Sequence, residues 1–517
     1  MQKGILKRFM KFLVIGIITY IVLLCFVLCT TPRSPLSNVR IVNGRKFNVG
    51  ITALVICLLI AVESYCMSMN PMWTGEYPTE HLHQYELMAE SLLQGRLDLP
   101  CEASPELKAM DNPYDYNMRE QLGVEYHWDH AYKDGHYYMY FGVVPALVLY
   151  LPYRMITGEP LNCYHGTQVF CAGIIIGLFV TLYFLIKIFK ANVSYVTYLL
   201  MSTTFSMICV WSCMNTPSLY CTAISSGVCF AIWSMVCYFC AVFLEMKYSK
   251  RIVLAVLGAL CGALTFGCRP TIGLANLIAI PLCCLFIKKN VKCRKQLVGL
   301  LCVFVPYILV GIGLMYYNYA RYGNILEFGQ RYQLTVTDQL SLGFGAVSLR
   351  TICGAIGNYL FAWKCGFTEY FPYVKLQGAI LNYPILILGF VMLFVPTVWK
   401  RLKQEQLIGV KIGLWLSVIA IAICDSMMSP YIRERYHMDI YWLLCIDCML
   451  SAVLLFENDA IRVKRMELIV SVACFMSLFL ILLYYMIPDG DNTFGEVLYN
   501  TYVIKIYKVL GLNGMLF

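Results

Sequence analysis

Long apolar stretches are the feature that most limits how this chain can fold. Thirteen can be cut from the 517 residues, and most reach the roughly 17–25 residues that a helix needs to cross a hydrocarbon core of about 30 Å. Stretches this long and continuous predict helices rather than barrel strands, because a backbone in lipid must satisfy its own hydrogen bonds. We therefore expect an all-α polytopic membrane protein with about 12 transmembrane helices and a further re-entrant or membrane-surface helix. The stretches lie near residues 12–31, 49–68, 141–157, 167–187, 194–213, 218–244, 252–267, 271–287, 297–317, 379–399, 407–424, 438–456 and 467–487.

Composition excludes several classes of protein. Hydrophobic residues make up 60% of the chain and charged residues 14%, which argues against a cytoplasmic enzyme and against disorder. The net charge of +10 could suggest a nucleic-acid partner, but the basic residues are scattered in short clusters between apolar stretches, so we expect no nucleic acid. Most of the 25 cysteines lie inside apolar stretches, where a free cysteine packs as a small hydrophobe.

Basic clusters predict the orientation of the chain. From residue 187 onward they occupy every second connection, which places those connections in the cytoplasm. Residues 318–377, the short turn 425–437 and the tail 488–517 then face outward. The clusters are Lys187 and Lys190; Lys247, Lys250 and Arg251; Lys288, Lys289, Lys292, Arg294 and Lys295; Lys400, Arg401 and Lys403; and Arg462, Lys464 and Arg465.

The front of the chain leaves two orientations open. The N-terminus and the connection 32–48 each carry four basic residues, so the charge rule does not choose between them. We favour a membrane-surface or re-entrant helix for residues 141–157, because Pro145 and Pro152 interrupt the stretch and Arg154 ends it. The loop 69–140 then faces outward; if 141–157 spans instead, that loop is cytoplasmic.

We expect four segments along the chain. Residues 1–48 hold an N-terminal helix, uncleaved rather than a secretory signal, and a cytoplasmic loop. Residues 49–335 form the main transmembrane module with its first external loop. Residues 336–487 add C-terminal helices and the second external loop, and residues 488–517 form an external tail.

Two acids of the first external loop are the candidate general bases. Glu80 begins a helix-like run soon after the membrane exit, and Asp129 stands just before the stretch that returns to the membrane. A carboxylate near the membrane surface can be partly desolvated and accept a proton. Taken alone, each acid is better explained as a solvated loop residue or a helix cap, and it is the pair together that favours a catalytic role. The histidines of this loop show no zinc-site spacing, so we assign no metal ligand, although a divalent metal remains possible.

Outward arginines are the candidate phosphate ligands. Arg269 lies between two apolar stretches that are shorter than the membrane core, so we expect its turn to sit below the outer surface and face a protein-lined cavity. Arg331, Arg433 and Arg435 follow in later outward segments, and Arg321 lies close to Arg331. The planar guanidinium suits phosphate, although each arginine could instead pair with a neighbouring acid or a lipid headgroup.

Two acids lie inside apolar stretches, Asp447 and Glu63. An intramembrane acid is a functional candidate by default. Either could instead be neutral and hydrogen-bonded between helices.

The layout resembles the GT-C superfamily of integral membrane glycosyltransferases, with local similarity to its protein mannosyltransferase and aminoarabinose transferase branch. In that branch an Asp-Glu pair precedes Tyr-x-x-x-Ala. Tyr85-Glu-Leu-Met-Ala89 resembles the second part, and Tyr137-Tyr-Met-Tyr-Phe-Gly-Val-Val-Pro145 resembles a later segment of the family. The positions of the acid pair hold His81 and Leu82, so Glu80 is the nearest substitute and Asp129 its rival.

The resemblance implies a function. A loop carboxylate would deprotonate an acceptor hydroxyl, while outward arginines stabilise the departing lipid phosphate. The donor would be a polyprenyl-phosphate-linked sugar and the acceptor a glycan, lipid or protein of the cell envelope, in a bacterial plasma membrane. The implied substrate-binding residues are Tyr85, Trp128, His130, Tyr137 and Tyr138.

Other functions remain open. A transporter or flippase of lipid-linked glycans would also use many helices, but it would place polar groups along a central path and show inverted repeats. An enzyme similar to O-antigen ligases or polymerases would carry its dominant loop late in the chain, whereas the loop richer in carboxylates is early here.

Overall fold

The structure is a computed structural model that describes most of the chain in two compact units. The described residues are 28, 31, 34, 38–41, 46–68, 83–215, 217–341, 349–362, 366–367, 374–375, 378–428, 434–456 and 460–485. Unit 1 comprises residues 1–71, 172–216 and 354–517, and unit 2 comprises residues 72–171 and 217–353. Each unit is thus assembled from stretches that are far apart in the sequence. The four segments expected along the chain stay a prediction.

Ten helices among the described residues are long and apolar enough to cross a membrane. A further pair, Pro384–Met392 and Pro396–Gln404, is bent by 68° and would make an eleventh span if it counts as one. These elements coincide with eleven of the thirteen apolar stretches. The stretch 141–157 contains only the short apolar helix Ala146–Thr157, as its prolines predicted, and the stretch 12–31 lies outside the described residues. The helical, multi-pass fold is therefore confirmed.

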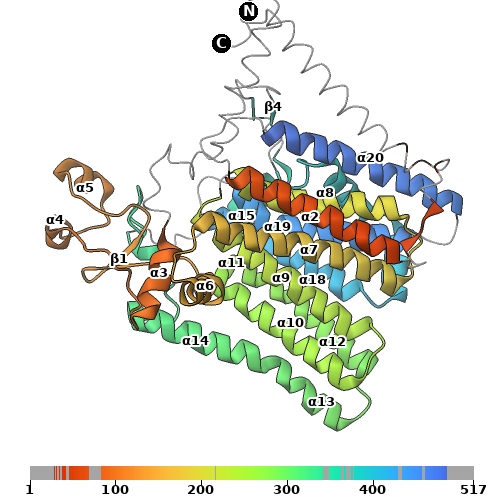
Figure 1. Ribbon diagram of the computed structural model, residues 1–517, viewed down its shortest axis with the longest axis horizontal. Helices are drawn as coiled ribbons and strands as arrows, with labels where there is room; N and C mark the ends of the chain where they lie inside the picture. The colour runs from red at the N-terminus through yellow and green to blue at the C-terminus, as the bar shows by residue number, and fades with distance from the viewer. Residues whose placement is uncertain are drawn as a thin grey trace, which may run out of the picture. The chain divides into compact units, whose positions relative to one another are not determined.

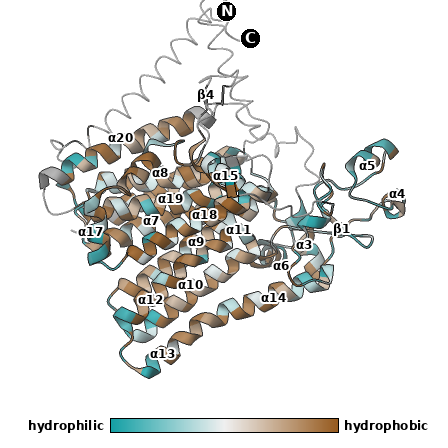
Figure 2. Ribbon diagram, turned by 180° about the vertical axis from the view of Figure 1, so that it is seen from behind, coloured by the Kyte–Doolittle hydropathy of each residue, from teal (hydrophilic) through white to brown (hydrophobic). Residues whose placement is uncertain are grey.

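Unit 2 contains a group of long helices that pack along one another (Figure 1). Helix α10 packs against both α9 and α14. Figure 2 shows hydrophobic residues along these helices and hydrophilic residues around the α12–α13 connection. The elements are α9 (Leu219–Phe243), α10 (Tyr248–Cys268), α11 (Pro270–Gly273), η5 (Leu274–Ile278), α12 (Ala279–Asn290), α13 (Arg294–Leu300), η6 (Leu301–Val303), α14 (Phe304–Tyr322) and η7 (Gln330–Tyr332).

The first loop of unit 2 folds into short elements with clear local causes. Helix α5 begins after Asp115, whose carboxylate accepts a hydrogen bond from the Met118 N–H at 3.2 Å, and it ends at Gly123 with φ of 61°. Pro145 precedes η4, and Gly158 with φ of 77° ends α6. The elements are α3 (Gln84–Leu93), α4 (Pro105–Ala109), α5 (Tyr116–Leu122), β1 (Ala131–Lys133), β2 (His136–Tyr138), η4 (Ala146–Tyr150) and α6 (Leu151–Thr157).

Unit 1 is a second helical group. Helix α8 packs against α2, α19 and α20, and α19 also packs against α16 and α18. The elements are α2 (Lys46–Ser68), α8 (Tyr195–Asn215), α16 (Pro384–Met392), α17 (Pro396–Gln404), α18 (Ile408–Met428), α19 (Glu434–Leu455), α20 (Ala460–Tyr485) and the short strands β3 (Gly366–Phe367) and β4 (Val374–Lys375). The division between the two units falls within helices α7 (Cys163–Phe189) and α15 (Leu349–Phe361).

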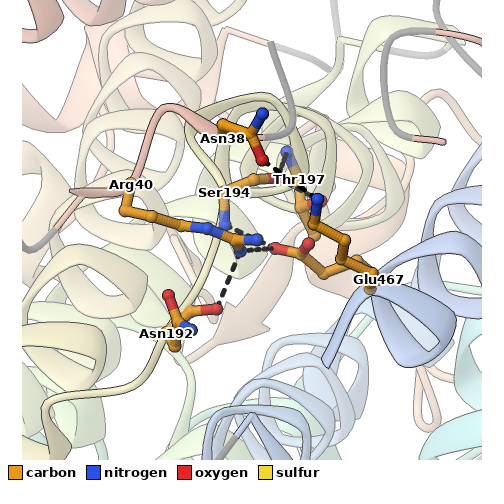
Figure 3. A network of polar contacts seen from close by, with 7 residues as sticks. Asn38, Arg40, Asn192, Ser194, Thr197 and Glu467 are labelled. Carbon is orange, nitrogen blue, oxygen red and sulfur yellow. Dashed lines mark hydrogen bonds and ion pairs between the residues drawn. The ribbon is translucent and has the colours of Figure 1, made fainter. Parts of the chain in front are cut away.

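A polar network in unit 1 joins the connection before α2 to the connection before α8 and to the start of α20 (Figure 3). The Arg40 guanidinium donates to the Glu467 carboxylate at 2.7 Å and to the Asn192 carbonyl at 2.9 Å. The Ser194 N–H donates to the same Glu467 oxygen. The Lys464 ammonium donates to the Asn38 side chain at 3.0 Å. Residues 38–41 therefore lie at the same end of the unit 1 helices as residues 192–194.

These contacts bear on the orientation that the charge rule left open. The basic clusters at 187–190 and 462–465 predict that their connections are cytoplasmic, so residues 38–41 belong to that side as well. Because α2 then crosses the membrane once, the loop that follows Ser68 begins on the opposite, outward side. The contacts thus favour the orientation in which residues 69–140 are external.

Candidate functional site

A β-hairpin in unit 2 builds the region around Asp129. Strands β1 and β2 pair antiparallel, with Ala131 opposite Tyr138 and Lys133 opposite His136. Asp134 and Gly135 form the two-residue turn with φ of 53° and 84°. An Asp-Gly pair suits such a turn because both residues tolerate positive φ. The hairpin places the buried Tyr137 ring against His130, with ring centroids 5.8 Å apart.

Asp129 lies at the entrance to this hairpin and is almost completely buried. Only 3% of the surface of the residue is exposed, and its φ of 59° lies in the left-handed region. One carboxylate oxygen accepts a hydrogen bond from the Tyr220 hydroxyl, and the other accepts one from the Gln333 amide. Left-handed backbone at a non-glycine residue is uncommon and gathers at functional sites. The site thus joins a residue of the first loop to the start of α9 and to the loop after α14.

Backbone pairing fixes the two loops against each other. The Asp129 N–H donates to the Leu334 carbonyl at 3.0 Å, and the Leu334 N–H donates to the His130 carbonyl at 2.9 Å. The amide of Gln84, at the start of α3, donates to the Asp129 carbonyl at 2.8 Å. This short antiparallel pairing holds Gln333 beside Asp129. Both outer loops therefore meet at the same end of unit 2.

Two buried arginines join the same loops through backbone carbonyls. Arg119 has no exposed surface; it donates to the Pro113 carbonyl at 2.5 Å and to the Thr335 carbonyl at 2.7 Å. Its guanidinium also stacks over the Tyr126 ring, 4.4 Å from the centroid. Arg321, near the end of α14, donates to the Met139 carbonyl at 2.6 Å. Arg119 thus ties the first loop to the loop after α14, and Arg321 ties α14 to the first loop. Such charge-assisted hydrogen bonds are strong where water is excluded.

Aromatic side chains surround the site. Burial raises the pKa of Tyr137 to about 12, so its hydroxyl is neutral at physiological pH. That hydroxyl accepts a hydrogen bond from the His127 N–H at 3.2 Å. Phe141 contacts the Tyr220 ring edge to face, with centroids 5.5 Å apart. An apolar shell of this kind lowers the local dielectric around the Asp129 carboxylate and strengthens its electrostatic interactions.

The two candidate bases differ in what the structure reports. Glu80 lies outside the described residues. Asp129 is buried in a defined polar arrangement. Its catalytic role stays a prediction.

The described phosphate-ligand candidates belong to both units, Arg269 and Arg331 to unit 2 and Arg435 to unit 1. Arg269 is half-buried at the end of α10, close enough to the Tyr85 hydroxyl for its charge to oppose the burial that raises the pKa of Tyr85. Arg331 is exposed in η7, two residues before Gln333. Arg435 lies in unit 1, with its guanidinium 5.5 Å from the Tyr436 ring centroid. Arg433 lies outside the described residues.

The reason given for placing the Arg269 turn below the outer surface is wrong. The flanking helical segments, Tyr248–Cys268 and Pro270–Asn290, have 21 residues each rather than 16 and 17, because polar and basic residues extend both at their far ends. At 1.5 Å per residue each spans about 31 Å, enough for the membrane core. Length therefore no longer requires a submerged turn. Residues 137–145 pack on the turn. Gly142 lies so close to the Gly267 and Cys268 carbonyls that a Cβ at this position would clash with them.

The predicted substrate-binding residues differ in accessibility. Tyr85, Tyr137 and His130 are buried, and Tyr85 stacks on Tyr150 with centroids 5.2 Å apart. Trp128 is 37% exposed, and Tyr138 is half-buried against Tyr322. Trp128 and Tyr138 therefore offer accessible aromatic surface for a ligand, while the other three are packed inside unit 2. Their roles stay predictions.

Among the residues that the structure describes, no group of three or more His, Cys, Asp or Glu side chains could hold a metal ion. His127 and His130 do approach each other, with ring centroids 5.4 Å apart, but the Nδ1 of His130 hydrogen-bonds the Trp128 carbonyl at 2.8 Å. A divalent metal stays an untested expectation.

Sequence reasoning missed four residues of this site: Tyr220, Gln333, Gln84 and Arg119. Tyr220 and Gln84 stand at the first or second position of their helices, directly beside the outer loop, which is a usable signal. Gln333 follows the predicted ligand Arg331 by two residues. Nothing in the local sequence distinguishes Arg119 from a solvated helix arginine, because its carbonyl partner Thr335 is 216 residues away.

Comparisons with known proteins leave the family open. No protein-family model matches the sequence, and no curated protein sequence matches it. A solved structure similar to this chain is the apo form of the oligosaccharyltransferase from Archaeoglobus fulgidus, with a TM-score of 0.46 and 10% sequence identity. The similarity covers 83% of this chain and 55% of that protein, so this chain spans little more than half of the length of the neighbour. At this level it assigns neither family nor activity.

Proposed function

We propose that this protein is a membrane glycosyltransferase of GT-C type that transfers a sugar from a polyprenyl-phosphate donor to a cell-envelope glycan, lipid or protein at the outer face of a bacterial plasma membrane. The observation that carries the proposal is Asp129: a buried carboxylate held between two outer loops of a multi-pass helical protein. A carboxylate in this setting suits a general base that deprotonates an acceptor hydroxyl.

The geometry supports specific roles. The Tyr220 hydroxyl and the Gln333 amide fix the direction of the Asp129 carboxylate, so that it would meet a substrate hydroxyl in a defined orientation. Trp128, next to Asp129 in the chain and partly exposed, is placed to stack on a sugar ring. The half-buried Arg269 and the exposed Arg331 are the candidates for the departing lipid phosphate. Glu80 remains the alternative base.

The test compares two aspartates of the same loop. Asp129 and Asp134 both have positive φ, but Asp134 is exposed, with 80% of its side-chain surface accessible. The full-length protein, reconstituted in vesicles with radiolabelled polyprenyl-phosphate sugars and envelope acceptors, should transfer label. Asp129→Asn keeps the shape and the tolerance of positive φ but removes the base, so transfer should fall by roughly 10²–10⁴-fold. Asp134→Asn should retain wild-type transfer.

Retained transfer in Asp129→Asn would remove Asp129 as the base. If Glu80→Gln then abolished transfer, the base would be Glu80. Absence of transfer with every polyprenyl-phosphate sugar, in protein that is folded, would contradict the proposed donor class.

A further inference from the structure

Two connections of unit 2 lie side by side at the end of the helices that the basic clusters place in the cytoplasm. The first, residues 244–251, comprises the connection between α9 and α10 together with the first turn of α10, and the second, residues 288–296, comprises the connection between α12 and α13 together with the adjoining helix ends. The Tyr248 hydroxyl donates to the Gln296 carbonyl, and the Asn290 amide donates to the Val242 carbonyl at 3.0 Å. The Tyr248 ring also packs on Phe286, with centroids 6.1 Å apart. Basic residues of both connections are therefore gathered on one small surface.

The charge of this surface is strongly one-sided. The two connections contain eight basic residues and a single acid, Glu245. Arg251 is half-buried, and its guanidinium donates to the Ala241 carbonyl at 2.9 Å and to the Val242 carbonyl at 3.1 Å. The other seven are exposed, and we call them the basic patch. They are Lys247, Lys250, Lys288, Lys289, Lys292, Arg294 and Lys295.

Apolar side chains continue from the basic patch along α13 and η6. Leu297, Val298 and Leu301 are 46%, 56% and 59% exposed, in a segment that continues into the spanning helix α14. At the other edge the Lys289 ammonium lies over the Phe243 ring, 4.4 Å from its centroid. Cations at the membrane surface with apolar side chains immediately below them match the two chemical halves of a phospholipid.

We propose that the basic patch is a binding site for anionic phospholipid headgroups of the cytoplasmic leaflet, with the acyl chains lying along Leu297, Val298 and Leu301. The positive-inside rule accounts for basic residues in each connection separately. It does not require the two connections to be pinned together by Tyr248 and Asn290. Clusters of four to eight Lys and Arg beside a membrane helix attract anionic lipids.

The experiment measures lipid binding without any sugar substrate, so its outcome is separate from that of the proposed transfer. Full-length protein in nanodiscs is titrated with phosphatidylglycerol or phosphatidylcholine, and retained lipid is counted by native mass spectrometry. The test variant is Lys288→Gln/Lys289→Gln/Lys292→Gln/Lys295→Gln. The control variant, Lys187→Gln/Lys190→Gln/Lys400→Gln/Lys403→Gln, removes the same charge from other cytoplasmic connections.

Wild type and control should prefer phosphatidylglycerol, and the test variant should bind it at least tenfold more weakly. Higher ionic strength should reduce the preference, because the patch is exposed. Equal phosphatidylglycerol binding by the test and control variants would overturn the proposal. So would tighter binding of soluble polyglutamate than of phosphatidylglycerol by the wild-type patch, since that would indicate an acidic protein partner.

Discussion

Two buried acids of unit 1, Asp447 and Glu467, face cations, whereas the described hydrogen bonds of the buried Asp129 of unit 2 come from neutral groups. In unit 1, Asp447 contacts the Lys411 ammonium at 2.6 Å and Glu467 contacts the Arg40 guanidinium at 2.7 Å. In unit 2, Asp129 accepts from a phenol and an amide. A buried ion pair compensates its own charge and ties helices together. A buried carboxylate held in one direction is suited to accept a substrate proton, which is why we propose a structural role for the two ion-paired acids and a chemical role for Asp129.

The largest effect should follow from breaking the Lys411–Asp447 pair. Both side chains are at most 4% exposed, so Lys411→Met leaves an uncompensated charge between α18 and α19. The free energy of unfolding should fall by about 3–5 kcal/mol. Thermal unfolding in detergent measures it, with Lys411→Met/Asp447→Leu as the control, because that double variant removes both charges. A single variant as stable as the double variant would mean that Asp447 is not held by Lys411.

A smaller loss of stability should follow at Glu467. Glu467→Ala leaves the Arg40 guanidinium and the Ser194 N–H without this acceptor, which should cost about 1–3 kcal/mol. Hydrogen exchange should show residues 38–41 opening faster. Glu405→Ala, in another connection of unit 1, is the control. Unchanged exchange at 38–41 would show that the network does not hold this connection, and the orientation drawn from it would lose its support.

Unit 2 should respond in activity rather than in stability. Gln333→Leu removes one of the two donors that orient Asp129, so transfer should fall about tenfold, mainly in kcat, while unfolding changes by no more than about 1.5 kcal/mol. Gln330→Leu in the same loop should leave transfer unchanged. A variant that unfolds readily but keeps its specific activity would place Gln333 among the structural residues.

The smallest effect concerns Asp98, beside the hairpin. A hydrogen bond from Arg96 holds the pKa of this half-buried carboxyl below its usual range, and the Nδ1 of His136 lies 3.1 Å from one carboxylate oxygen. Because the pKa is lowered on folding, the stabilisation is present above the unfolded value of about 3.9 and is lost as pH falls through the folded value. NMR titration of the Asp98 carboxyl should show this pKa, and Arg96→Gln should restore it. An unchanged pKa in Arg96→Gln would contradict the assigned cause.

The sequence predicted the spanning helices well because a helix in lipid is decided locally. Length and hydrophobicity within each described stretch were enough, and Pro145 and Pro152 correctly marked a stretch that forms only a short helix. Helix ends were less predictable, which is why the length argument for the Arg269 turn failed: Tyr248 and Lys289 extend their helices beyond the apolar stretch. The depth of that turn stays a prediction.

The site was harder to predict because its partners are remote in sequence. Asp129 was singled out by its place before the returning segment, but Tyr220 and Gln333 reach it across 91 and 204 residues. No periodicity or spacing records such contacts. The family's acid pair falls on His81 and Leu82 in this chain, and Glu80 was predicted only as the nearest acid. The backbone pairing of residues 129–131 with 333–334 shows that the loop after α14 meets Asp129.

The most direct measurement follows transfer and thermal unfolding together in Asp129→Asn. An amide can replace the carboxylate between Tyr220 and Gln333 once the Gln333 amide turns over, so the unfolding temperature should stay within about 4 °C of the wild type. Label transfer should nevertheless fall by at least about 100-fold. Loss of stability in step with loss of transfer, or transfer that persists, would place Asp129 with the structural acids of unit 1 and contradict the account.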